Sequence, residues 1–125
     1  MSRTKANPKR VSSSLPDLVT REILLSFWKV HILHHAAEGP IYGQWIAEEL
    51  RRHGYSLSPG TLYPLLKRME GNGWLKASPS TNSAGHARKE YRLTKDGAKV
   101  LAFLRDQVKE LHREFVEEAH GSKSH

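Results

Sequence analysis

Residues 57–71 read Leu-Ser-Pro-Gly-Thr-Leu-Tyr-Pro-Leu-Leu-Lys-Arg-Met-Glu-Gly, and this stretch decides the fold. Ser58 can cap a helix and Pro59 fits the first helical position, so a helix is expected to begin here. Its apolar residues recur at helical spacing and predict one buried stripe: Leu62, Leu65, Leu66 and Met69. The opposite face is small and basic, which suits close approach to a nucleic-acid groove, although an ordinary amphipathic surface helix has the same pattern.

Two more helices are expected before this stretch. The first spans residues 18–37, and its apolar side chains lie around nearly the whole circumference, so other parts of the structure must pack against it on more than one side. Because the chain is short, we expect one of these packing surfaces to come from another subunit. Gly39 and Pro40 end this helix, and the second helix fits residues 43–52.

A hairpin and a long helix are expected after the stretch. Residues 74–78 and 88–94 predict two strands, and the small polar segment 79–87 between them predicts an exposed hairpin tip. Thr94 can cap a last helix over residues 95–120. The order helix, helix, helix, hairpin describes a winged helix-turn-helix. The predicted fold class is therefore mainly α with a small β-hairpin: a winged helix-turn-helix plus a long C-terminal dimerisation helix.

This interpretation divides the chain into four parts. They are a flexible basic arm (1–14), a winged helix-turn-helix DNA-binding domain (15–94), a C-terminal dimerisation helix (95–120) and a disordered tail (121–125). The arm has too few apolar side chains to offset the entropy lost on ordering. The last helix carries a short heptad seam at spacings of 3, 4, 3 and 4, made up of Leu101, Leu104, Val108, Leu111 and Phe115.

The charge is unevenly distributed along the 125 residues. The chain has 20 Lys and Arg against 13 Asp and Glu, a formal net charge of +7 and a pI near 9.9. Residues 51–95 alone carry nine basic and two acidic side chains, and residues 1–14 carry four basic and no acidic ones. Nucleic acid is the first candidate partner and an anionic membrane surface the second. Two winged helix-turn-helix domains related by a two-fold axis would fit a DNA duplex better than a flat membrane surface. We therefore expect double-stranded DNA as the partner and no membrane.

Several classes of protein are disfavoured by the features that the sequence lacks. The chain has no cysteine, which excludes disulfides, cysteine-ligated zinc, iron–sulfur clusters and thiol catalysis. Residues 1–14 lack the apolar region of a secretory signal, and no apolar run approaches the roughly 20 residues that span a bilayer. No phosphate-binding glycine loop, dinucleotide fingerprint, zinc-protease motif or nucleophile elbow occurs. We therefore expect a cytoplasmic protein that is not an enzyme and has no cofactor.

The expected hairpin is also basic. Gly85 and His86 fall at its tip, and Arg88 and Lys89 follow on the second strand. A basic hairpin beside a basic helix is the arrangement of a wing that reaches a DNA backbone or minor groove. The alternative is a solvated hairpin whose charges merely suit a strand.

Four segments of the chain carry a family resemblance. They are residues 37–43 (AEGPIYG), 57–70 (LSPGTLYPLLKRME), 73–75 (GWL) and 88–97 (RKEYRLTKDG). Together they resemble the PadR family of bacterial transcriptional regulators, in order and over roughly residues 18–120. Gly-Thr-Leu-Tyr-Pro is the most specific piece, because a generic winged helix does not require it. Two features depart from the family: Gln44-Trp45 stands where members often have Tyr-Glu, and the N-terminal arm is longer than the family core requires.

The resemblance implies a homodimeric repressor that binds a pseudo-palindromic operator, of the short subfamily with a single C-terminal helix. The candidate DNA-contacting residues are Ser58, Gly60, Thr61, Tyr63, Lys67, Arg68, His86, Arg88 and Lys89. The last helix would pack with the first helix of the second copy. The candidate dimer-interface residues are Ile23, Phe27, Leu101, Leu104, Val108, Leu111 and Phe115.

The resemblance also implies a candidate small-molecule partner. Some PadR-like dimers bind flat aromatic compounds between the first and last helices, so a small aromatic effector that releases the repressor is a candidate. Phe27, Trp28 and Phe103 are the residues expected to border such a pocket, with core packing as the alternative.

Two tyrosines have separate expected roles. Tyr63 could donate its hydroxyl to a phosphate or pack beside the second helix. Tyr42 is expected to be structural and to close the first turn against the recognition helix.

Three histidines of the first helix form a separate pattern. His31, His34 and His35 follow the spacing i, i+3 and i+4, which can converge on a metal ion. No carboxylate or cysteine completes an evident set nearby, and eight histidines in the chain make chance neighbours common, so no metal site is predicted. A pH-sensitive dimer interface is another use of these residues.

Two other functional classes stay open at this point. The chain could be an adaptor whose winged helix binds protein, with the heptad helix as the docking element. It could also be a sensor whose main task is to bind an aromatic compound. Binding to mixed duplex DNA at low salt discriminates the regulator from the adaptor, and tryptophan quenching that survives changes on the DNA face would favour the sensor.

Overall fold

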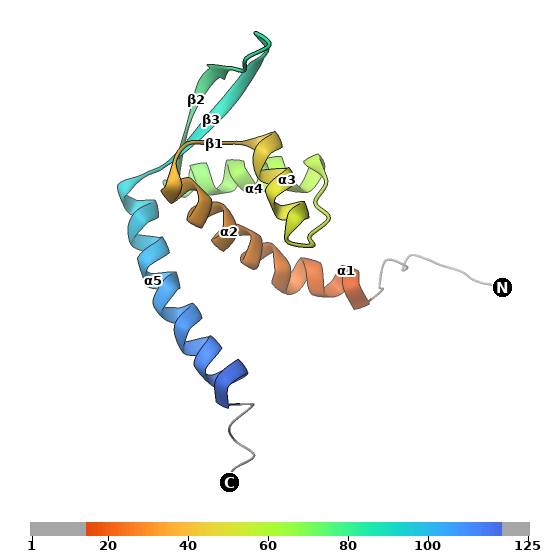
Figure 1. Cartoon of the computed structure of the whole chain (residues 1–125), viewed down its shortest axis with the longest axis vertical. Helices are drawn as coiled ribbons and strands as arrows, with labels where there is room; N and C mark the ends of the chain where they lie inside the picture. Colours follow the sequence, from red (N-terminus) through yellow and green to blue (C-terminus); the bar gives the residue numbers. More distant parts are fainter. Residues whose placement is uncertain (1–14, 119–125) are drawn as a thin grey trace, which may run out of the picture.

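A computed structural model describes residues 15–118, which form a helical body with a β-hairpin projecting from one end (Figure 1). In chain order the elements are α1 (Leu15–Val19), the π-helical turn η1 (Thr20–Leu24), α2 (Leu25–Glu38), β1 (Ile41–Tyr42), α3 (Gly43–Arg52), α4 (Pro59–Gly71), β2 (Leu75–Thr81), β3 (Ala87–Leu93), α5 (Lys95–His112) and the π-helical turn η2 (Arg113–Glu117). The predicted fold class is confirmed. The predicted arm (1–14), the last two residues of the predicted final helix (119–120) and the predicted tail (121–125) lie outside the described residues.

The core lies where α2, α3, α4 and the start of α5 meet the sheet. The four apolar residues predicted to form the inner stripe of α4 are all buried, and α3 begins and ends at the residues that its pattern predicts. From the other elements the core receives Trp28, Ile32, Leu33, Ala36, Ile41, Ile46, Leu50, Leu75, Tyr91 and Leu101. Helices α2 to α5 and all three strands therefore share one hydrophobic core.

The sheet is larger than the expected hairpin. It has three antiparallel strands in the order β1-β3-β2, because Ile41 pairs with Tyr91 and Tyr42 with Glu90. A two-residue strand has no alternating pattern, so β1 could not be found from the sequence. The expected hairpin connection over residues 79–87 was too long. The first strand continues to Thr81, and its proline is tolerated because β2 is an edge strand.

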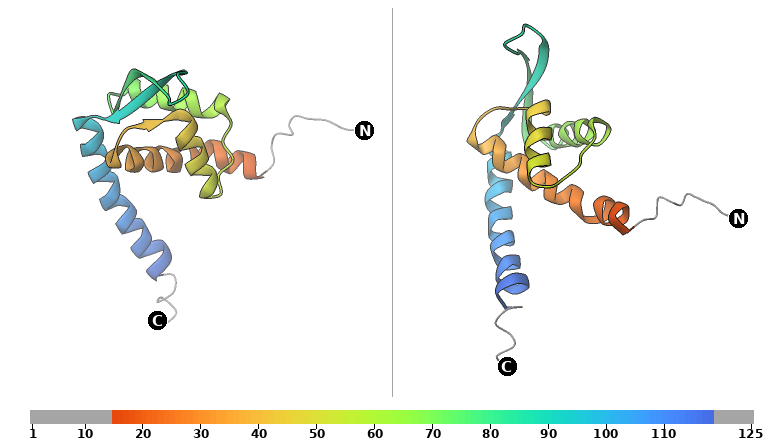
Figure 2. Two further views of the ribbon diagram at one scale, coloured as in Figure 1. Left: turned by 45° about the horizontal axis from the view of Figure 1, so that its top comes forward. Right: turned by 45° about the vertical axis from the view of Figure 1, so that its right-hand side comes forward.

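The long helix α5 is fixed to the body at its first turn. Thr94 caps it as predicted: its Oγ1 accepts a hydrogen bond from the Gly97 N–H at 2.9 Å. The same hydroxyl donates to the Gly73 carbonyl oxygen at 2.6 Å. A Cβ at Gly97 would overlap the backbone carbonyl oxygen of Trp74, so only glycine fits there. From this junction α5 runs away from the hairpin, at an angle to α2 (Figure 2).

Candidate nucleic-acid interface

The exposed side of α4 presents small and basic residues. Gly60, Pro64, Lys67, Arg68 and Gly71 are all exposed, as the helical pattern predicts. Backbone atoms of this helix can therefore approach a ligand closely, with two cations beside them.

The start of α4 differs in one detail from the sequence expectation. Ser58 occupies the N-cap position, but its hydroxyl makes no capping hydrogen bond and lies 3.3 Å from the Thr61 hydroxyl instead. The first-turn N–H groups of α4 therefore have no side-chain acceptor from Ser58. A helix N-terminus of this kind attracts an anionic group.

Tyr63 connects α4 to the start of α3. Its ring lies against Gly43, where a Cβ would come within 2.5 Å of the tyrosine Cε1 atom. The ring is nonetheless about half exposed. One side of the Tyr63 ring therefore packs beside α3, and the rest of the side chain stays accessible.

Tyr42 is structural, but its partners differ from those expected. Its hydroxyl donates to Glu90 Oε1 at 3.2 Å, and the Arg88 guanidinium lies 3.5 Å from the centre of its ring. Both partners belong to β3, so Tyr42 supports the hairpin, and Tyr63 makes the contact between α4 and the start of α3. Glu90 also accepts from Arg92 Nε at 2.6 Å, which partly neutralises one cation of the hairpin.

The hairpin tip is ordered by Asn82, which sequence reasoning did not identify. Its Oδ1 accepts hydrogen bonds from the backbone N–H groups of Ala84 and His86, each at 2.9 Å. Gly85 has φ +84°, a left-handed conformation that glycine adopts without strain. An asparagine three residues before a glycine in a polar segment is the local signal that could have predicted this turn.

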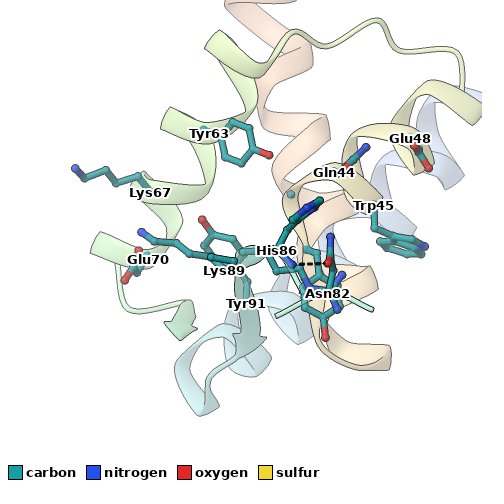
Figure 3. A pocket seen from close by; sticks show the side chains of 14 residues that line it. Gln44, Trp45, Glu48, Tyr63, Lys67, Glu70, Asn82, His86, Lys89 and Tyr91 are labelled. Carbon is teal, nitrogen blue, oxygen red and sulfur yellow. Dashed lines mark hydrogen bonds between the residues drawn. The ribbon is translucent and has the colours of Figure 1, made fainter. Parts of the chain in front are cut away.

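An open cleft of about 750 Å³ separates the hairpin from α3 and α4 (Figure 3). It brings together five of the nine candidate DNA-contacting residues: Tyr63, Lys67, His86, Arg88 and Lys89. The other four, Ser58, Gly60, Thr61 and Arg68, lie on α4 or at its start but do not line the cleft. We call the exposed side of α4 together with the hairpin residues 82–89 the basic face.

A tyrosine lies beneath the cations of the basic face. Tyr91 is buried there, and burial raises the pKa of its hydroxyl, with further increases from the nearby Glu70 and Tyr63. The phenol therefore stays protonated beneath the exposed cations.

A second surface is the apolar groove between α2 and α5, of about 660 Å³. Its apolar lining is Phe27, Val30, Leu101, Val108 and Leu111. Among the candidate dimer-interface residues, Ile23, Phe27, Val108, Leu111 and Phe115 are exposed, the last to 74%. Leu101 and Leu104 differ from this expectation: Leu101 belongs to the chain's own core and Leu104 is partly buried, because α5 begins against the body.

The three aromatic residues expected to border one effector pocket do not come together. Phe27 lines the groove, but Trp28 is only 3% exposed and packs edge-on against Tyr55 in the core. Phe103 is 62% exposed and does not line the groove. Helical geometry explains the separation, since Trp28 follows Phe27 by one position and Phe103 follows the inward Leu101 by two.

The histidines of the first helix do not form one cluster. His31 and His35 group with His53 of the next helix end, whereas His34 groups with His35 and Glu38. The sequence pattern identified the first-helix residues, but only the fold brings His53 to them.

Among residues 15–118, no helix is long and apolar enough to span a membrane.

The sequence matches the family model of the transcriptional regulator PadR-like family over residues 32–103. The chain belongs to the PadR-like family. Transcriptional regulator Rv3488 of Mycobacterium tuberculosis (strain ATCC 25618 / H37Rv) is 44% identical over 105 residues, which cover 84% of this chain and 94% of that protein. The predicted family membership is thereby confirmed.

Solved structures of PadR-like proteins share the fold. A PadR family regulator from Eggerthella lenta DSM 2243 matches with a TM-score of 0.65 and 29% identity, over 86% of this chain and 91% of that one. A PadR family regulator from hypervirulent Clostridium difficile R20291 matches with a TM-score of 0.63 and 30% identity, over 72% and 98%. PadR-like proteins are transcriptional regulators and not enzymes, in agreement with the sequence prediction.

Proposed function

We propose that this PadR-like regulator is a cytoplasmic repressor that binds a pseudo-palindromic DNA operator as a homodimer. One observation carries the proposal: side chains from α4 and from the hairpin, about 20 residues apart in sequence, face the same cleft. Cations on two neighbouring elements of a winged helix match the charge and shape of a duplex.

The two parts of the basic face would act on different parts of the DNA. The small residues on the exposed side of α4 allow it to enter the major groove, and Ser58 and Thr61 at its start fix the register. Lys67 and Arg68 lie where they would meet phosphates. The hairpin, with His86, Arg88 and Lys89, would reach the flanking backbone or minor groove.

The apolar groove supports the homodimer. Exposed apolar side chains on α2 and α5 are typical of a surface that a second subunit covers. A two-fold dimer would hold two copies of α4 about 34–36 Å apart, so that both enter successive major grooves.

The groove also supports a role for an apolar effector, although only one of the three aromatic residues expected to border it lines the groove. Phe27 is the aromatic side chain that faces the groove, and an aromatic compound bound there would contact α2 and α5 together. Such binding would release DNA if it changed the spacing of the two heads. Adding the compound should then lower the affinity for DNA.

Selection of bound sequences from a random duplex pool tests this function. We expect enrichment of a palindrome whose half-sites lie one helical turn apart. The double variant Lys67→Ala/Arg68→Ala should bind the selected sequence and unrelated duplexes more weakly by a similar factor, because both side chains are expected at phosphates. An unsymmetric sequence would contradict the dimeric mode, and no enrichment by the unaltered protein would contradict sequence-specific binding.

A further inference from the structure

We propose that His31, His35, His53 and Glu49 form a zinc-binding site where α2 meets the C-terminal end of α3. The first two residues lie one turn apart on α2, and the others belong to the last turn of α3 and the residue that follows it. This site lies apart from the basic face, and its His31 also lines the apolar groove.

The three imidazoles are close enough to share one ion. One ring nitrogen from each lies within 4.8 Å of the other two. Two ligands of a tetrahedral zinc ion lie roughly 3.3 Å apart, given zinc–nitrogen bonds of about 2.0–2.1 Å. The nitrogen atoms must therefore move closer together to share an ion. His53 can make this movement, because its side chain is 45% exposed at the end of α3.

Glu49 lies beside two of the three histidines and would supply a fourth ligand once the side chains close on the ion. Its Oε2 lies 3.7 Å from His35 Nε2 and 3.5 Å from His53 Nε2, near the separation of two ligands on one ion. Its other oxygen, Oε1, accepts a hydrogen bond from Arg52 Nη1 at 2.9 Å. This bond orients the carboxylate and turns Oε2 toward the histidines, as an outer-shell partner does in metal sites.

The burial of His35 is an independent observation that points to a ligand. Its side chain is 10% exposed, and within residues 15–118 neither ring nitrogen has a hydrogen-bond partner. Leaving a buried polar group unpaired costs free energy, and a bound ion relieves that cost.

A second group shares His35 but fits an ion less well. His34 and Glu38 lie on the solvent side of α2, and His35 Nδ1 faces Glu38 Oε1 at 3.5 Å. Both outer residues are about half exposed or more, and all three come from a single helix. Three imidazoles and a carboxylate from two helices make the stronger site, and this ligand set suits zinc.

Calorimetric titration of Zn²⁺ into the untagged, metal-free full chain tests the proposal. We expect His53→Ala to weaken zinc binding at least tenfold, and circular dichroism should show that this exposed substitution leaves the fold intact. His34→Ala and His112→Ala are the matched controls and should bind zinc as the unaltered chain does. The proposal is overturned if the unaltered chain takes up no zinc, if His53→Ala binds normally, or if His34→Ala loses as much affinity as His53→Ala.

Cobalt substitution tests the carboxylate separately. Co²⁺ in place of zinc gives visible absorption bands that report the coordinating atoms. Glu49→Gln should change these bands and weaken binding several-fold. Identical bands in the variant and the unaltered chain would remove Glu49 from the ligand set.

Discussion

The basic face and the apolar groove are both exposed, but for opposite reasons. On α4 the apolar residues are buried within the chain and the exposed side is polar, so this region is complete in one copy. On α5 only Gly97 and Leu101 are buried, whereas Val108, Leu111 and, in the following turn η2, Phe115 are exposed. The winged helix-turn-helix can therefore fold around its own core, whereas the exposed apolar residues of α5 require a second surface to cover them.

The largest effect is expected at the junction of the two regions. Gly97→Ala would push a methyl group into the Trp74 carbonyl, and the backbone there cannot give way cheaply. We expect a loss of about 3 kcal/mol in the free energy of unfolding, measured by urea denaturation. Gly71→Ala, where nothing lies within 4 Å of the added Cβ, is the control and should change stability by less than about 1 kcal/mol. Equal effects of the two substitutions would show that α5 is not anchored at this turn.

A charge placed in the apolar groove should disrupt the dimer without changing the basic face. Leu111→Glu would place a carboxylate on the surface that a second copy covers, so sedimentation should detect monomers. Affinity for operator DNA should fall roughly 100-fold, because the two heads are no longer linked. Gln107→Glu, a charge on the same helix outside the groove lining, should remain dimeric. A dimeric Leu111→Glu protein would exclude the groove as the subunit interface.

A single cation of the basic face should have a smaller effect. Lys67→Ala removes one expected phosphate contact, so DNA affinity should fall several-fold on every sequence. The slope of log affinity against log salt should become shallower by about one. Lys99→Ala on α5 removes the same charge away from the basic face and should leave the slope unchanged. An unchanged slope for Lys67→Ala would remove this residue from the phosphate contacts.

The smallest effect concerns Tyr91 beneath the basic face. Because its pKa is raised in the folded protein above the ordinary value of 10.0, the unfolded chain loses this proton first as pH rises. The stability from the buried neutral phenol is therefore fully present below pH 10.0 and declines as pH rises through the folded-state pKa. Denaturation across alkaline pH should show a shallower decline for Tyr91→Phe. Identical profiles would indicate that Tyr91 ionises as freely as in the unfolded chain.

The helices could be predicted because their signals are local. The stripe on α4, the limits of α3 and the cap at Thr94 each depend on residues a few positions apart, and all three are confirmed. The five candidate residues that face the cleft could likewise be chosen from charge and position on helix or hairpin.

The remaining features depend on contacts between distant residues. The strand β1 exists only because β3 lies beside it, and Tyr42 finds its partner 48 residues away. His53 reaches the first-helix histidines only after α3 packs on α2. Trp28 and Phe103 were assigned to one pocket because apolar residues around a helix do not reveal which side faces inward.

An anisotropy titration of the unaltered protein on a mixed-sequence DNA duplex, at two salt concentrations, tests directly whether the basic face binds DNA. A basic face that meets several phosphates predicts clear binding at low salt and a steep loss of affinity as salt rises. No binding at low salt would contradict the assignment of this face to DNA and would favour a protein-binding adaptor instead.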